Sequence, residues 1–191
     1  VGAVGVKLYE KYSYSKETMD LSRYYGIEKE GQVPIILADV VAEEKAANID
    51  GNDYLPLSFV QEQLNSRFYY DMNEKLLLYT TALDLYEIPL DSTTYTVSGE
   101  AAEHTCPIFV LQDEVPYVSL SFMENFSNFI CNVYEAPHRL QIYTENVTHQ
   151  TAVIQKATAV RYQGGIKSDI LEQQDAGSQV TVLEEMENWS K

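Results

Sequence analysis

Two stretches of the chain follow one pattern: YLPLSFVQEQLNSRFYYD at residues 54–71 and YVSLSFMENFSNFICNVYE at residues 117–135. The identical residues fall at matching positions, namely Tyr54/Tyr117, Leu57/Leu120, Ser58/Ser121, Phe59/Phe122 and Asn65/Asn128. Apolar runs precede the two stretches, VPIIL at 33–37 and CPIFV at 106–110, and LLLYT (76–80) and LQIYT (140–144) follow them. A recurrence of this kind indicates an internal repeat whose units are built in the same way.

Each repeat predicts a strand, then a helix, then a β-hairpin. Ser58 and Gln61 have the spacing of a capping box, in which the two side chains satisfy exposed backbone N–H groups at a helix start. The same spacing recurs at Ser121 and Glu124, so we expect a helix to begin at each serine. Short β-prone runs separated by polar turns come next. The predicted fold class is therefore α+β, with two small strand–helix–hairpin units.

The last part of the chain predicts a third, all-β module. SQVTVLEE at 178–185 alternates in the manner of a half-buried strand, and Gly164-Gly165 predicts a turn before it. The pattern stops inside a further strand, so we expect unpaired strand edges. The module should then be poorly ordered, or be completed by a neighbouring molecule through self-association. The predicted organisation is an N-terminal segment (1–32), a first repeat (33–98), a second, shorter repeat (99–150) and the third module (151–191).

Composition limits the classes of partner. The 29 acidic against 13 basic residues give a formal charge of −16, which disfavours nucleic acids and anionic surfaces. The 15 tyrosines favour either a β-rich fold or a tyrosine-lined ligand face. No run approaches the roughly 18 apolar residues that cross a membrane. The opening VGAVGV (1–6) leaves two interpretations, the end of an upstream hydrophobic anchor or an arbitrary boundary.

The sequence offers little that indicates catalysis. The histidines (His104, His138 and His149) are scattered rather than spaced as metal ligands, so we expect no metal and no cofactor. Nucleophile-elbow, phosphate-binding-loop and dinucleotide motifs are all missing from the sequence. Cys106 and Cys131 leave both a disulfide and two free thiols open. We therefore predict that this chain is not an enzyme.

Two segments resemble known families. Leu55-Pro56-Leu57-Ser58-Phe59 and the Asp71–Lys75 turn are similar to the (L/V)PL-x-F and D-x-x-x-K motifs of the copper amine oxidase N-terminal-like domain. Residues 106–145 resemble that domain less closely, because Val118-Ser119-Leu120 replaces the proline form and the turn lacks its Asp and Lys. Residues 164–191, with the strand at 177–184 and Trp189, resemble the first half of a bacterial Src-homology-3-like domain, which implies an incomplete barrel.

The order of these modules resembles the region that precedes the catalytic barrel in clostridial glycoside hydrolases of family eighteen. This resemblance implies an extracytoplasmic segment from a Gram-positive cell envelope, tethered by an upstream transmembrane helix, with the glycoside hydrolase domain outside this chain. The implied function is non-catalytic: the modules bind the cell wall, or position the hydrolase on it. Peptidoglycan or a chitin-like glycan is the implied carbohydrate partner.

Aromatic side chains are the candidate ligand contacts. Tyr162 and Trp189 are the candidates in the third module, where the resemblance implies an aromatic groove for wall peptides; the alternative is that both are core residues of that module. Tyr69, Tyr70 and Tyr79 are candidates for stacking on sugar rings, although half of each strand must face the core. The alternative function is a structural stalk or a self-association spacer without a ligand of its own.

Overall fold

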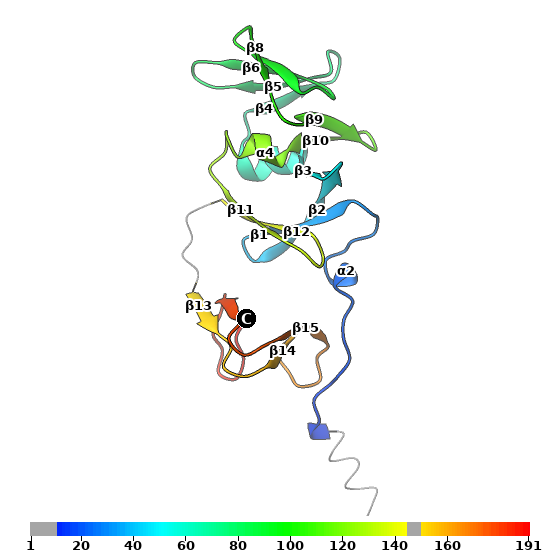
Figure 1. The fold of residues 1–191 in the computed structure, drawn as a ribbon, viewed down its shortest axis with the longest axis vertical. Coiled ribbons are helices and arrows are strands. Elements are labelled where there is room, and N and C mark those ends of the chain that lie inside the picture. Colours follow the sequence, from blue (N-terminus) through cyan, green and yellow to red (C-terminus); the bar gives the residue numbers. More distant parts are fainter. Residues whose placement is uncertain (1–10, 145–149) are drawn as a thin grey trace, which may run out of the picture. The chain divides into compact units, whose positions relative to one another are not determined.

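The computed structural model describes residues 11–144 and 150–191 (Figure 1). Residues 11–26 join residues 150–191 in one compact unit, here called the terminal unit, and residues 27–144 form a second, the central unit. Among the described residues, no helix is long and apolar enough to span a membrane.

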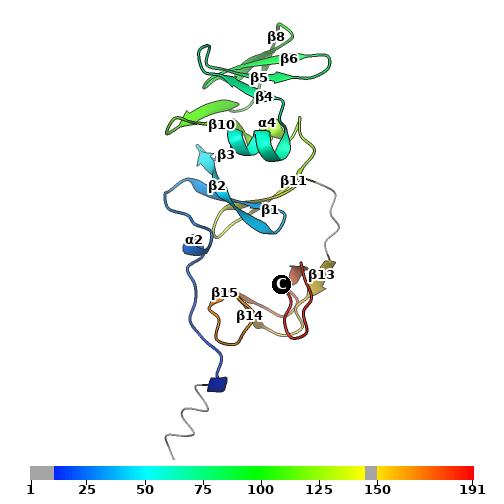
Figure 2. The same cartoon turned by 180° about the vertical axis from the view of Figure 1, so that it is seen from behind.

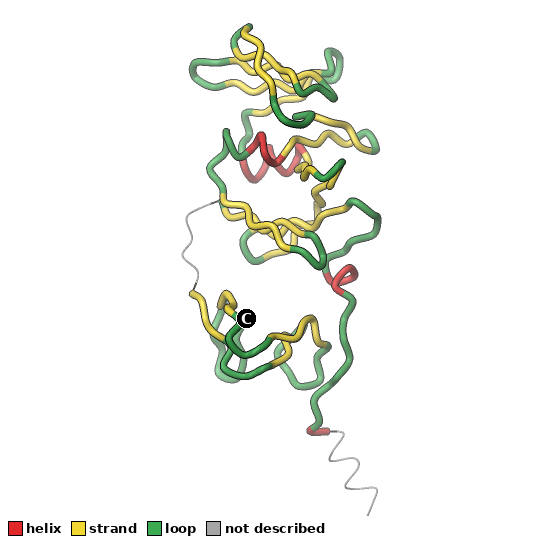
Figure 3. The backbone as a smooth tube through the Cα atoms, in the orientation of Figure 1, coloured by secondary structure: helices red, strands yellow, loops and turns green. Residues whose placement is uncertain are grey.

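Strands dominate both units, and the α+β prediction is wrong. Strands take up 47% of the residues and helices 10%, so the protein is mostly β. The helices in the described ranges are single turns or little more, as the short red segments of Figure 3 show. They are α2 (Leu21–Tyr24), α3 (Leu57–Phe59), the π-helix η1 (Val60–Leu64) and α4 (Leu120–Met123). Helices this short cannot form a layer of their own.

A seven-stranded sheet organises the central unit, in the order β11-β12-β1-β2-β3-β10-β9 (Figure 2). Its strands are β1 (Gln32–Leu37), β2 (Val40–Ile49), β3 (Asn52–Pro56), β9 (Phe109–Gln112), β10 (Val115–Ser119), β11 (Ile130–Tyr134) and β12 (Arg139–Tyr143). Strands β1 and β12 run parallel, and the other neighbours are antiparallel. Both sequence repeats therefore contribute strands to a single sheet.

This shared sheet explains why the repeats do not form separate strand–helix–hairpin units. The matching strands β3 and β10 pair with each other, with Leu55 opposite Val118. The hairpin of the second repeat returns to the first repeat, where Leu140 of β12 lies opposite Ile35 of β1. Two or three strands alone are marginally stable, and pooling them buries more apolar surface.

The hairpin of the first repeat belongs to a different, five-stranded sheet. This sheet is an antiparallel meander of β4 (Phe68–Asp71), β5 (Leu76–Thr80), β6 (Leu85–Pro89), β7 (Thr94–Val97) and β8 (Glu100–Glu103). In Figures 1 and 2 the short helices of the central unit lie between strands β9 and β10 on one side and β11, β12, β1 and β2 on the other, so the curved seven-stranded sheet flanks them. Buried side chains from both sheets and from the helices, such as Leu77, Phe109 and Phe122, make one continuous core.

The predicted capping boxes are also wrong. The helices begin one residue earlier, after the extended N-cap residues Pro56 and Ser119. At neither helix start does the N-cap side chain accept a hydrogen bond from a backbone N–H group of the first turn. Ser58 and Ser121 therefore lie inside the first turn. The Ser58 hydroxyl donates to the carboxylate of Glu44, and the Ser121 hydroxyl is hydrogen-bonded to a histidine described below.

The terminal unit combines the two ends of the chain. Strand β13 (Gln150–Val153) pairs with β16 (Gln179–Val182), and β14 (Thr158–Arg161) pairs with β15 (Ile170–Gln174). The N-terminal segment pairs with the start of β15, where Thr18 and Ile170 form a parallel β-bridge. Met19 N–H donates to Ile170 O over 2.8 Å, and Ile170 N–H donates to Glu17 O over 2.8 Å. This edge is thus paired within the chain, and self-association stays a prediction.

Candidate ligand-binding surface

Three aromatic side chains of the terminal unit lie around residues 162–164 and form what we call the aromatic site: Tyr24, Tyr162 and Trp189. The side chain of Tyr162 is 49% exposed and that of Trp189 37% exposed. The Tyr24 ring meets the Tyr162 ring edge-on, with centroids 5.9 Å apart. A Cβ atom at Gly164 would lie 3.3 Å from Cγ of Trp189, so the indole packs directly on the glycine backbone. The structure thus places both predicted residues of this module close to the same turn.

Tyr24 was not predicted as part of this site, because it lies far from Tyr162 in the sequence. The folding of the N-terminal segment against residues 150–191 brings the two rings together. Arg161 holds that segment by donating from Nη2 to the Ser15 carbonyl over 3.0 Å, and its guanidinium lies 5.5 Å from the centroid of the Tyr14 ring. Lys167 Nζ donates to the Ser13 carbonyl over 2.7 Å. Arg161 and Ser15 are 146 residues apart in sequence, and no local pattern signals their contact.

The three candidate tyrosines of the central unit do not form a common platform. Tyr69 on β4 is 61% exposed. Its neighbour Tyr70 turns to the opposite face, where its ring lies 4.9 Å from that of Phe109. Tyr79 on β5 is only 5% exposed and stacks on Phe68 at 4.4 Å. Tyr69 alone of the three faces solvent freely.

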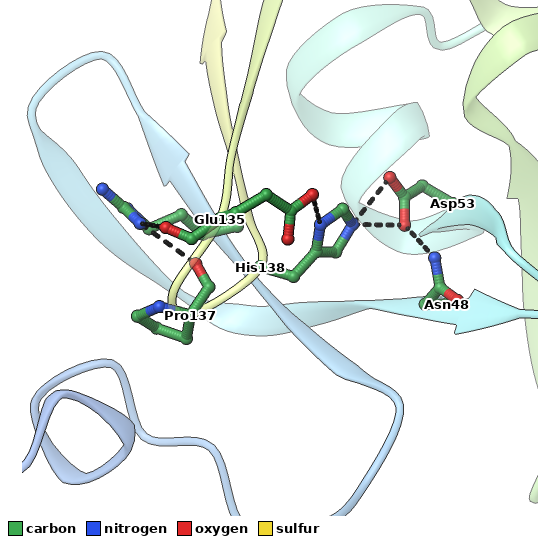
Figure 4. Close-up of polar contacts among 6 residues, drawn as sticks. Asn48, Asp53, Glu135, Pro137 and His138 are labelled. Atoms are coloured by element: carbon green, nitrogen blue, oxygen red, sulfur yellow. Dashed lines mark hydrogen bonds and ion pairs between the residues drawn. The ribbon is translucent and has the colours of Figure 1, made fainter.

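A charge cluster in the central unit is centred on His138, in the β11–β12 turn (Figure 4). Its Nε2 lies 2.9 Å and 3.0 Å from the two carboxylate oxygens of Asp53, and its Nδ1 lies 2.9 Å from Glu135 Oε1. Asn48 Nδ2 donates to Asp53 Oδ1 over 2.8 Å. Arg139 donates to the backbone carbonyls of Glu135 and Pro137. The cluster ties the β11–β12 turn to β3.

Both ring nitrogens of His138 face carboxylates, an arrangement that fits the doubly protonated imidazolium. Burial by itself would lower the pKa of His138, but the hydrogen bonds to Asp53 and Glu135 outweigh it and raise the pKa above its ordinary value. Since both nitrogens are occupied, the ring has no lone pair to offer a substrate or a metal. Its role in this geometry is a structural ion pair.

A small open cavity of about 310 Å³ lies elsewhere in the central unit. Its lining residues are Ile49, Asp50, Asn52, Tyr54, Asp91, Pro107, Val110, Leu111 and Gln112. The pKa of Tyr54 is raised chiefly by burial, and Cys106 and the carboxylates of Asp50 and Asp91 raise it further. This phenol therefore stays protonated. Two carboxylates and no basic side chain in the lining disfavour an anionic ligand there.

The described residues also contain potential metal ligands and two cysteine thiols. Within residues 11–144 and 150–191, no group of three His, Cys, Asp or Glu side chains is placed to hold a metal ion. Cys106 and Cys131 are free thiols, which answers the question that the sequence left open. Burial raises the pKa of Cys131 to about 12, with smaller contributions from Glu124 and Asp53. His149 lies outside the described residues.

No family model, curated protein or solved structure matches the chain. The resemblances to the copper amine oxidase N-terminal-like and Src-homology-3-like domains therefore stay predictions that rest on the quoted motifs.

Proposed function

We propose that this chain is a non-catalytic binding segment that holds a glycan hydrolase at the bacterial envelope, with the aromatic site as its contact to the glycan. The observation that carries this proposal is the grouping of Tyr24, Tyr162 and Trp189 around one turn, with two of these side chains well exposed. Aromatic rings give large, rigid contact area at low entropic cost, which suits the flat apolar face of a sugar ring.

The net charge of the protein limits the chemical classes of ligand that it can bind. A formal charge of −16 repels polyanionic wall polymers and favours a neutral, acetylated glycan such as chitin or the glycan strand of peptidoglycan. The nearby cations Arg161 and Lys167 donate to backbone carbonyls of the N-terminal segment. Stacking and hydrogen bonding to neutral sugars, rather than ion pairing, would then supply the affinity.

Co-sedimentation with insoluble peptidoglycan and with chitin tests the proposal. We expect the chain to pellet with one of these glycans, and Tyr162→Ala and Trp189→Ala to weaken pelleting severalfold, because alanine removes the stacking ring. Tyr134→Ala is the matched control, since Tyr134 is comparably exposed at 42% but lies on β11 of the central unit and is not a candidate ligand contact. Binding that survives both substitutions in the aromatic site would refute that site's role.

The alternative is a structural stalk or self-association spacer. The pooling of both repeats into one seven-stranded sheet supports it, since it makes the central unit a single compact element. Failure of the chain to pellet with either glycan, together with a monomeric and rigid particle in solution scattering, would favour the spacer. A concentration-dependent increase in mass would favour self-association.

A further inference from the structure

A serine and a histidine of the central unit are joined side chain to side chain. Ser121 is exposed in the first turn of α4, and His104 follows β8. The Ser121 Oγ and His104 Nε2 atoms lie 3.0 Å apart, within hydrogen-bonding distance. A hydroxyl in contact with an imidazole is the pairing that activates serine nucleophiles, because the ring can accept the proton as the oxygen attacks.

Further hydrogen bonds lead to this pair from the interior. The hydroxyl of Ser119, which is 1% exposed, lies 2.9 Å from that of Ser121, and Cys106 Sγ lies 3.5 Å from Ser119 Oγ. When Cys106 donates to Ser119 and Ser119 donates to Ser121, the remaining Ser121 proton points to His104. Hydrogen bonds in such a chain polarise one another, which strengthens the bond to the imidazole.

The imidazole is held in a form that can act as a base. Its ring meets the Phe122 ring edge-on, with centroids 5.7 Å apart and planes at 85°. Burial lowers the pKa of His104, which favours the neutral ring, and the tautomer with its proton on Nδ1 offers the Nε2 lone pair to Ser121. In contrast to His138, this ring forms no ion pair with a carboxylate of residues 11–144 or 150–191.

The internal repeat supplies a comparison within the same molecule. Ser58 occupies the position in α3 that Ser121 occupies in α4, and it is likewise exposed. Its hydroxyl donates to the carboxylate of Glu44 instead of to an imidazole. A glutamate carboxylate is a weaker base than an imidazole, since the ordinary pKa of the first is about 4.3 and that of the second about 6.5. Two serines in the same backbone setting thus differ in the group that would take the proton.

We propose that Ser121 is a nucleophile that accepts an acyl group from an activated ester, with His104 as its general base. Ser121 Oγ forms a bond to the acyl carbon while its proton moves to His104 Nε2. The ester C–O bond then breaks, and the leaving alcohol takes that proton. The products are an O-acyl serine, a neutral histidine and the free alcohol. This acylation modifies Ser121 once and does not turn over, so it is compatible with the non-catalytic role proposed above; it involves the central unit and is independent of glycan binding by the aromatic site.

The full chain incubated with p-nitrophenyl acetate tests this proposal. We expect release of p-nitrophenolate and an acetyl group at Ser121 in peptide mass spectra, with Ser58 unmodified. Ser121→Ala should abolish the modification, and His104→Gln should slow it at least about tenfold, since general-base catalysis contributes ~10²–10⁴-fold. Ser58→Ala is the matched control and should leave the rate unchanged.

Two further variants separate loss of the nucleophile from loss of the fold. Ser121→Cys keeps a nucleophile beside His104 and should still be acylated, at the cysteine. Ser119→Ala removes the hydroxyl that is hydrogen-bonded to Ser121 and should slow acylation less than His104→Gln does. Equal acetylation of Ser58 and Ser121, or an unchanged rate in a folded His104→Gln variant, would overturn the proposal.

Discussion

Asp53→Asn isolates the charge that holds His138. The side chains of Asp53 and His138 are 13% and 28% exposed, so the pair is largely shielded from water. A hydrogen bond to a charged group contributes about 1.5–3 kcal/mol, and asparagine keeps an acceptor oxygen while it loses the charge. We therefore expect the variant to lose about 2 kcal/mol of unfolding free energy at pH 6. For a unit of this size that corresponds to a Tm about 8 °C lower.

The pH dependence provides the sharper test. The pKa of His138 is raised in the folded protein, so the pair stabilises fully below the unfolded pKa, roughly 6.5. This stabilisation is lost as pH rises through the raised folded pKa. The Tm difference between the unsubstituted protein and Asp53→Asn should therefore be largest near pH 6 and shrink toward pH 9, as followed by circular dichroism melts.

The second carboxylate supplies the control. Glu135 also contacts His138, but its side chain is 75% exposed, and exposed ion pairs contribute about 0–1 kcal/mol. Glu135→Gln should lower the Tm by a few degrees at most. Arg139, a cation in the same turn, donates to the backbone carbonyls of Glu135 and Pro137. If Glu135→Gln costs as much as Asp53→Asn, or the difference grows with pH, the assignment of His138 as a half-buried imidazolium is wrong.

Three other predictions follow from single contacts. Gly164→Val should displace the indole of Trp189, whose Cγ lies 3.3 Å from the added Cβ, and shift tryptophan fluorescence to longer wavelength. Met19→Pro removes the N–H that donates to Ile170, which should cost about 1 kcal/mol and speed hydrogen exchange in the terminal unit alone. Cys131, whose pKa burial raises to about 12, should react with a thiol reagent at pH 8 roughly a thousandfold more slowly in the folded than in the unfolded protein, because its thiolate fraction falls by about that factor.

Local sequence determined several elements correctly. The apolar run at 33–37 becomes β1, and the two matching stretches each place a strand and a short helix at the same positions. These features depend on neighbouring residues, because β-branched and aromatic runs fit a pleated surface wherever the strand is finally paired. The boundaries depended on finer geometry: Pro56 and Ser119, rather than the serines of the predicted capping boxes, precede the helices.

Only the tertiary structure decided which strands meet and which side chains gather. The pairing of Ile35 with Leu140 and of Leu55 with Val118 joins the repeats in one sheet, and a local pattern cannot specify a partner so far along the chain. The contact of Tyr24 with Tyr162 likewise depends on the N-terminal segment pairing at Ile170. Alternation along a strand can be recognised in the sequence, but the choice of inward face depends on which apolar surfaces pack together, and that is a property of the whole core.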